Sequence, residues 1–194
     1  MGLIGPCRGL LRYLSHEEIQ QLLAASSGDL KDMIIVALGT GMRASEVLGL
    51  DRDQLDIKNA VVKLKDSKNG DRRLVPLPSQ VVNVLHNRPV PLRELFPGWP
   101  LDKLMHTVHR VAKQAGLQGV TFHTLRHTFA SHAVMAGVEL YTLVKLLGHR
   151  DLAQVQRYAH FAPAHLQAAT NQAATAIFAD QVPRPMPHEQ GAVA

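Results

Sequence analysis

Apolar residues recur at helical spacing along most of this chain, and residues typical of helix ends separate the apolar stretches. A capping box formed by Ser15 and Glu18 predicts a first helix that runs to about Ala24. Similar patterns predict helices at 29–38, 43–50, 79–86, 101–116, 124–136 and 140–147. The pattern is therefore that of a mainly helical protein.

The ends of these helices carry their own signals. Ser79 is expected to cap the helix at 79–86, and Gly39 and Gly41 are expected to end the helix at 29–38. Gly148 is expected to end the helix at 140–147. A later short helical segment is expected to carry Tyr158, and an Ala-rich helix with an apolar stripe should follow from 163 to about 179.

The segment at 54–77 follows a different, period-two pattern. Val62 and Leu64 alternate with polar positions, and the Asn-Gly pair at 69–70 predicts a tight hairpin turn. Pro76 lacks a backbone N–H and is expected in an edge strand. The predicted fold class is therefore α+β, mainly α, with one small three-stranded antiparallel sheet.

Length and composition indicate one main domain. The chain has 194 residues, of which 46% are hydrophobic, enough for one well-packed core. Residues 1–12, with several glycines and a proline, are expected to be an irregular lead-in or linker, and 13–180 the domain. Residues 181–194 contain three spaced prolines and are expected to form a disordered tail, while 88–100 should be a long connection.

The charge of the chain favours an anionic partner. Lys and Arg number 21 against 16 Asp and Glu, and the isoelectric point is near 9.6. Six basic residues lie between Lys58 and Arg73 against two acidic ones, so much of the excess lies in the predicted hairpin; a merely solvated face is the alternative. Cys7 is the single cysteine, and neither a membrane-spanning run nor a signal peptide is evident. We therefore expect a soluble intracellular protein.

Several positions carry side chains suited to phosphate chemistry. Arg126 follows His123 by three residues, so both lie on one helical face, and an arginine offers a fork of donors to phosphate oxygens. Arg43 begins a helix, where the dipole disfavours positive charge, so a site that needs this charge is as plausible as an exposed arginine. The zinc-like spacing of His123 and His127 lacks the glutamate of the zincin motif, because Thr124 stands there, so metal ligation is not expected.

A Leu-Gly-His stretch ending at His149 and a tyrosine nine residues later complete the pattern. Tyr158 alone would be taken for a half-buried core tyrosine, as Tyr141 is expected to be. His127, His132 and His160 are interpreted as packing or phosphate-contact residues rather than catalysts.

Taken together and in this order, these motifs resemble the catalytic domain of the tyrosine recombinases, the phage-integrase family of DNA strand-exchange enzymes. The resemblance covers roughly 12–179 and includes every position of the family's catalytic set. The matching residues are Arg43, Lys68, His123, Arg126, His149 and Tyr158, with Glu46 at the acidic position after the first arginine.

The resemblance implies a role for each residue. The arginines and histidines would bind the scissile phosphate, and Tyr158 would attack it to form a 3′-phosphotyrosyl intermediate. Lys68 resembles the general acid that protonates the leaving 5′ oxygen, with Lys63 and Lys65 as rivals. Strand exchange would need neither a metal nor a nucleotide cofactor.

The resemblance also implies partners. The expected ones are double-stranded DNA and further protomers, in a tetramer on DNA and as a monomer without it, in a bacterial or phage-infected cytoplasm and away from membranes. The DNA contacts are expected from the hairpin residues Lys63, Lys65, Arg72 and Arg73. The DNA-clamping domain that usually precedes this one is not expected within the chain. A non-cleaving DNA-binding module of the same fold and a type IB-like topoisomerase are the alternatives.

Overall fold

The computed structural model describes residues 11–64, 73–88, 93–149, 151–161 and 163–178, with backbone alone at 160 and 163–169. The chain divides into two compact units, Met1–Phe161 and Ala162–Ala194. The fold is mainly helical with one small antiparallel sheet, which confirms the predicted class. No helix in the described part is long and apolar enough to cross a membrane.

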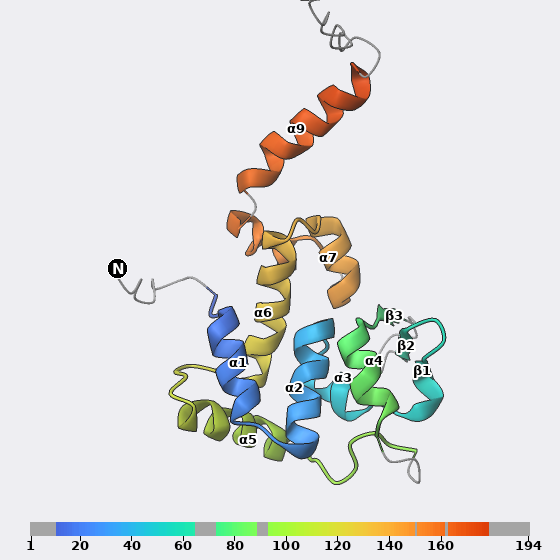
Figure 1. Cartoon of the computed structure of the whole chain (residues 1–194), viewed down its shortest axis with the longest axis vertical. Helices are drawn as coiled ribbons and strands as arrows, with labels where there is room; N and C mark the ends of the chain where they lie inside the picture. The colour runs from blue at the N-terminus through green and yellow to red at the C-terminus, as the bar shows by residue number, and fades with distance from the viewer. Residues whose placement is uncertain (1–10, 65–72, 89–92, 150, 162, 179–194) are drawn as a thin grey trace, which may run out of the picture. The chain divides into compact units, whose positions relative to one another are not determined.

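The first unit contains the helices α1 to α8 (Figure 1). Their bounds are His16–Ala24 (α1), Gly28–Thr40 (α2), Ala44–Leu48 (α3), Ser79–His86 (α4), Leu101–Gln114 (α5), Phe122–Met135 (α6), Leu140–Leu147 (α7) and Ala153–Gln156 (α8). Short 3₁₀ turns lie at Arg52–Gln54 (η1) and Ala159–Phe161 (η2). The predicted capping box of Ser15 and Glu18 is present at the start of α1, and an equivalent pair, Thr121 and Thr124, starts α6.

The core is organised around α2, which packs against α6 on one side and α4 on the other (Figure 1). Its buried residues, including Met33, Ile34 and Val36, form one broad face of this helix. A broad apolar face of this kind must be covered by neighbouring elements. The helices α1 and α3 also pack against α2, and α5 packs against α3 and α6.

Local signals mispredicted two helix ends. Gly39 lies inside α2, which continues to Thr40 and is capped by the left-handed Gly41. At position 39 a Cβ would meet the Val81 side chain at 2.6 Å, so this glycine lets the start of α4 approach α2 closely. Ser79 is the first residue of α4 rather than its cap; Pro78 occupies the cap position.

The sheet consists of β1 (Leu55–Asp56), β2 (Val61–Leu64) and β3 (Arg73–Pro76), antiparallel in the order β1-β2-β3. The register pairs Val62 with Leu55 on one side and with Val75 on the other. The predicted alternation is confirmed, because Val62 and Leu64 are buried while Lys63 is exposed. Pro76 lies in an edge strand, as predicted. The predicted turn at 69–70 lies outside the described residues.

The described parts of the connection at 88–100 are tied to α2 by charge. Arg88 donates to Asp29 Oδ1 and Asp32 Oδ2, each at 2.7 Å, and its guanidinium lies 4.3 Å from the Phe96 ring centroid. Trp99 Nε1 donates to the other oxygen of Asp29 at 3.1 Å. These contacts fix the connection against the N-terminal half of α2.

The second unit contains α9, Pro163–Ile177, in agreement with the predicted C-terminal helix. Ile177 and Phe178 are 72% and 51% exposed, so the end of the predicted stripe presents apolar surface. The predicted limits of the domain and its tail, at 12/13 and 180/181, stay predictions.

Candidate active site

Arg126 is the buried centre of the site. It projects from α6, and its side chain is held by the ends of two other helices. Nη1 donates to the Gly41 carbonyl at the end of α2 at 2.6 Å, and Nη2 donates to the Leu147 carbonyl at the end of α7 at 2.7 Å. Carbonyls at helix C-termini are unpaired and carry partial negative charge. They therefore stabilise and orient this buried cation.

Arg126 remains protonated at neutral pH despite its environment. Burial, and next the positive charge of Arg43, lower its pKa to about 10. The nearby Glu46 acts in the opposite direction.

Arg43 is positioned by Glu46 and by the end of α7. It occupies the N-cap position of α3 rather than its first turn, and it is exposed. Its Nη1 donates to Glu46 Oε1 at 2.9 Å, its backbone N–H to Glu46 Oε2 at 2.7 Å, and its Nη2 to the Gly148 carbonyl at 3.2 Å. The two arginines therefore bind neighbouring carbonyls of the same helix end.

Arg73 supports this arrangement from the sheet. Its Nη2 donates to Glu46 Oε2 at 2.9 Å, and only 17% of its side chain is exposed. Its guanidinium lies against Gly148, where an added Cβ would collide with it. Gly148 also has φ +63°, a conformation that favours glycine. The sequence analysis expects Arg73 to contact DNA from the hairpin, and that role stays a prediction. In the structure Arg73 shares the Glu46 carboxylate with Arg43.

The other predicted hairpin residues are described only in part. Lys63 is exposed and forms an ion pair with Asp56 at 3.1 Å. Lys65, Lys68 and Arg72 lie outside the described residues. The DNA-binding role of these residues and the choice of general acid therefore stay predictions.

His149 completes the cluster around Arg126. Its Nε2 lies 2.8 Å from Arg126 Nη2. Because an arginine only donates, Nε2 must accept, and the imidazole is neutral with its proton on Nδ1. Burial, and next the charge of Arg126, lower the pKa of His149 to about 4, which agrees with this assignment.

His123 lies exposed in the first turn of α6, one turn before His127. Its pKa is lowered by partial burial and by the charge of Arg126. The rings of His123 and His127 meet edge to face with centroids 4.3 Å apart. Among the described residues no group of three or more His, Cys, Asp or Glu side chains gathers as a metal site would require.

Tyr158 is buried, with 2% of its surface exposed, and its hydroxyl lies 2.6 Å from His127 Nδ1. It follows α8 in the turn before η2 rather than lying in a helix as predicted. Burial raises the pKa of Tyr158, although the charges of Arg126 and Arg157 oppose this rise. Tyr141, in contrast, is 64% exposed, so its predicted half-buried position is wrong.

The sequence did not identify His127 as a partner of Tyr158. These residues are 31 positions apart, and their contact depends on how the α8 segment folds against α6. No local signal in the sequence specifies that contact.

A hollow of about 310 Å³ opens beside these residues. Arg43, His123 and Arg126 line it together with apolar Met42, Met105 and Phe122. The arrangement offers two guanidinium groups and an imidazole to one anion, which is how proteins bind a phosphate.

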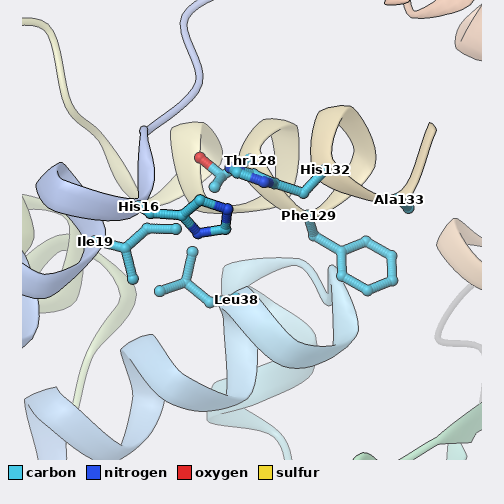
Figure 2. Close-up of a pocket in the computed structure, with 7 residues that line it drawn as sticks. All are labelled: His16, Ile19, Leu38, Thr128, Phe129, His132 and Ala133. Carbon is cyan, nitrogen blue, oxygen red and sulfur yellow. The ribbon is translucent and has the colours of Figure 1, made fainter. Parts of the chain in front are cut away.

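A second hollow of about 340 Å³ lies elsewhere, between α1, α2 and α6 (Figure 2). Figure 2 shows His16 and Ile19 from α1 and Leu38 from α2 facing the α6 side chains Thr128, Phe129, His132 and Ala133. None of the predicted catalytic residues lines it. Of these two hollows, the one beside Arg43 and Arg126 is the one that contains predicted catalytic residues.

Comparisons with known proteins agree with the fold described above. The model of the phage integrase family matches residues 12–90 and 101–165. The integrase of Escherichia phage P2 is 36% identical over 157 residues, covering 81% of this chain and 45% of that protein. The tyrosine recombinase XerD of Pseudomonas aeruginosa is 34% identical over 183 residues, covering 81% of this chain and 60% of that protein. The chain thus spans about half the length of the curated relatives it matches.

Solved structures show the same fold. The catalytic domain of bacteriophage HP1 integrase superposes with a TM-score of 0.69 at 30% identity, covering 83% of this chain and 94% of that domain. The XerH site-specific recombinase bound to its difH substrate, in a pre-cleavage complex, gives a TM-score of 0.69 at 24% identity, covering 86% and 55%. At that lower identity the likeness concerns the fold alone.

Proposed function

Because the chain belongs to the phage integrase family, we propose that it is the catalytic part of a site-specific DNA recombinase. It would break and rejoin DNA through a covalent bond between Tyr158 and a 3′ phosphate. The observation that carries this proposal is the pair of arginines, Arg43 and Arg126, both held by helix-end carbonyls and both lining one hollow.

The arginine pair suits the transition state of phosphodiester attack. Negative charge grows on the nonbridging oxygens as the new bond forms, so donors that are already oriented stabilise the transition state most. The carbonyls of Gly41, Leu147 and Gly148 and the carboxylate of Glu46 orient these guanidinium groups before any substrate binds. Little reorganisation is then needed when a phosphate arrives.

The histidines respond to the charge of the phosphate. Without an anion, His149 and His123 are disfavoured as cations, because burial and the arginines lower their pKa. A phosphate beside them has the opposite effect and raises the pKa of both imidazoles. Each imidazole can then donate to a phosphate oxygen.

Tyr158 supplies the nucleophile of the proposed reaction. A phosphotyrosyl ester conserves the energy of the broken strand, so the free 5′ hydroxyl can later attack it and rejoin DNA without a nucleotide cofactor. Lys68 remains the proposed general acid for the leaving 5′ oxygen, with Lys65 and Lys63 as its rivals.

The proposed partners are double-stranded DNA and further protomers. The net positive charge of the chain and the exposed Lys63 on β2 support DNA binding. A related recombinase is solved on its DNA substrate. We expect a bacterial or phage-infected cytoplasm, a tetramer on DNA, and an α9 that couples neighbouring protomers. A DNA-clamping domain outside the matched region would provide much of the affinity.

Covalent trapping tests the proposal. The chain is incubated with nicked suicide substrates made from DNA that flanks its own gene, and adducts are resolved by denaturing electrophoresis. The parent and Tyr141→Phe, which alters an exposed tyrosine, should form a 3′-linked adduct, whereas Tyr158→Phe should form none. An adduct that persists in Tyr158→Phe would contradict the assignment of the nucleophile.

A further inference from the structure

The contact between Tyr158 and His127 has no part in the chemistry described so far. The phenolic oxygen lies 2.6 Å from Nδ1 of His127, and Tyr158 is almost fully buried. Resting on the proposed function, we propose that His127 is the base that accepts the proton of Tyr158 as the phenol attacks the phosphate.

Burial determines where this proton can go. A phenol exposed to solvent can release its proton to water, but 2% exposure leaves Tyr158 little access to solvent. His127 Nδ1 lies within hydrogen-bonding distance of the hydroxyl, and an imidazole nitrogen can accept a proton that a backbone carbonyl cannot hold. His127 is therefore the side chain placed to take it.

The position of His127 links the base to the phosphate site. It follows Arg126 directly in α6, and it lies one turn after His123, whose ring it contacts. The same rigid helix thus presents two phosphate-facing residues and the base. A hydroxyl within hydrogen-bonding distance of a base is the usual arrangement for an activated nucleophile.

The groups around His127 keep it ready to accept a proton. His123, Arg157, Arg126 and His149 act on it electrostatically, and Tyr158 is its hydrogen-bonding partner. Burial, and next the electrostatic effect of His123, Arg157, Arg126 and His149, lower the pKa of His127 to about 4. The resting imidazole is therefore neutral. A phosphate anion bound by the arginines would counter the positive charges and make the imidazole more basic. Substrate binding would therefore switch on the base.

The proposed step balances as follows. The O–H bond of Tyr158 breaks and its proton moves to His127 Nδ1, while the phenolic oxygen forms a bond to phosphorus. The bond from phosphorus to the 5′ oxygen breaks, and that oxygen takes its electron pair and a proton from the general acid. During rejoining, the imidazolium returns its proton to the phenolic oxygen.

The rival interpretation is that His127 carries its proton on Nδ1, donates to the phenol, and only positions it. Replacement by asparagine separates the two, because the Asn oxygen lies near the place of Nδ1 and accepts a hydrogen bond but cannot take up the proton. His86→Asn, at an exposed histidine in the last turn of α4, is the matched control.

The experiment measures the rate of adduct formation against pH on the suicide substrate. His127→Asn should bind DNA as the parent does and form adduct about 100-fold more slowly or worse, the usual scale for general base catalysis. The parental rate should fall at acid pH as His127 becomes protonated, and this acid limb should be missing in His127→Asn. Parental rates with an unchanged pH profile in His127→Asn would overturn the proposal while leaving the proposed function intact.

A second measurement needs no activity. The imidazole ¹⁵N chemical shifts of His127 in the full chain without DNA should show an unprotonated Nδ1, and that signal should move in Tyr158→Phe. A protonated Nδ1 would overturn the proposal. If the parent forms no adduct at all, the proposed function fails, and the proposed proton transfer fails with it. The ¹⁵N shifts then report only the hydrogen bond between His127 and Tyr158 in the absence of DNA.

Discussion

Glu46 of α3 joins Arg43 to Arg73 of β3 through one shared carboxylate. One oxygen accepts from the Arg43 backbone and from Arg73, and the other accepts from the Arg43 guanidinium. The sequence placed an acidic residue close to Arg43, but it could not reveal that Arg73 shares the same carboxylate. That contact joins residues 27 positions apart.

Glu46→Gln should therefore lower activity more than stability. A glutamine has one acceptor oxygen and no charge, so it cannot hold both guanidinium groups. We expect adduct formation to slow by about tenfold, the effect of about 1.4 kcal/mol, while the fold persists. Glu139→Gln, at an exposed position without a side-chain cap bond, should be neutral. Equal rates in both variants would mean that Glu46 does not orient Arg43.

Two half-buried histidines, His127 and His149, predict how the free energy of unfolding depends on pH. The pKa values of His127 and His149 are about 4 in the folded chain, against about 6.5 for a free imidazole. Above pH 6.5 both states are neutral and the free energy of unfolding is at its full value. As pH falls from 6.5 towards 4, the unfolded chain takes up protons that the folded chain refuses, so this free energy decreases.

Urea unfolding at pH 7.5 and at pH 5.5 tests this dependence before most carboxylates titrate. The midpoint should fall at the lower pH, and by a smaller amount in a chain carrying both His127→Asn and His149→Asn. A parental midpoint that is constant between these values would contradict the neutral resting state of the pair.

The ends of α2 and α7 are the elements that hold the arginines of the proposed phosphate site. Each ends at a left-handed glycine, Gly41 or Gly148, so its last carbonyls turn outward and meet the arginines. The sequence predicted the cap at Gly148, and it named Gly41 together with Gly39 at the end of α2. It could not predict what the carbonyls bind, since that depends on where α6 crosses the two helix ends.

Gly148→Ala should be more damaging than the same change at another left-handed glycine. Gly116 also has a positive φ, +79°, but an added Cβ would meet nothing within 4 Å there. Gly116→Ala should cost only backbone strain, about 1–2 kcal/mol. Gly148→Ala should cost more and slow adduct formation, because Arg73 must move away from Glu46. Urea unfolding and adduct rates measure both effects, and equal losses at the two sites would show that the Arg73 contact is unimportant.

The elements themselves were largely predictable. Capping boxes, period-two alternation and glycine caps are local, and the structure contains the predicted helices and the three strands. The failures came from tertiary contacts. Gly39 lies inside α2 where the start of α4 packs against it, and Tyr158 lies in a turn from which its hydroxyl contacts His127 of α6.

For the whole molecule, the first unit contains the core and every described residue of the site, so α9 should be dispensable for folding. We predict that removing residues 164–194 leaves a folded chain that still forms adduct but no longer completes coordinated exchange. Two apolar residues at the end of the second unit, Ile177 and Phe178, are exposed. A helix that packs against a neighbouring protomer would need such apolar surface.

The measurement compares adduct and recombinant yields for the full and truncated chains, each placed behind a DNA-clamping domain. Adduct at or above the parental yield with loss of recombinants is expected. Parental yields of both products would show that α9 does not couple protomers.

The site is assembled from distant parts of the chain: Arg43 donates to a carbonyl 105 residues away. A chain still emerging from the ribosome folds its N-terminal part first and has Arg43 long before it has α7. Until α7 folds, the carbonyls of Leu147 and Gly148 cannot help to orient the two guanidinium groups, and Tyr158 is added later still. Under the proposed activity, a nascent chain, or a chain that terminates before Tyr158, would therefore be unable to cut DNA, because the site is incomplete until α7 and Tyr158 are in place.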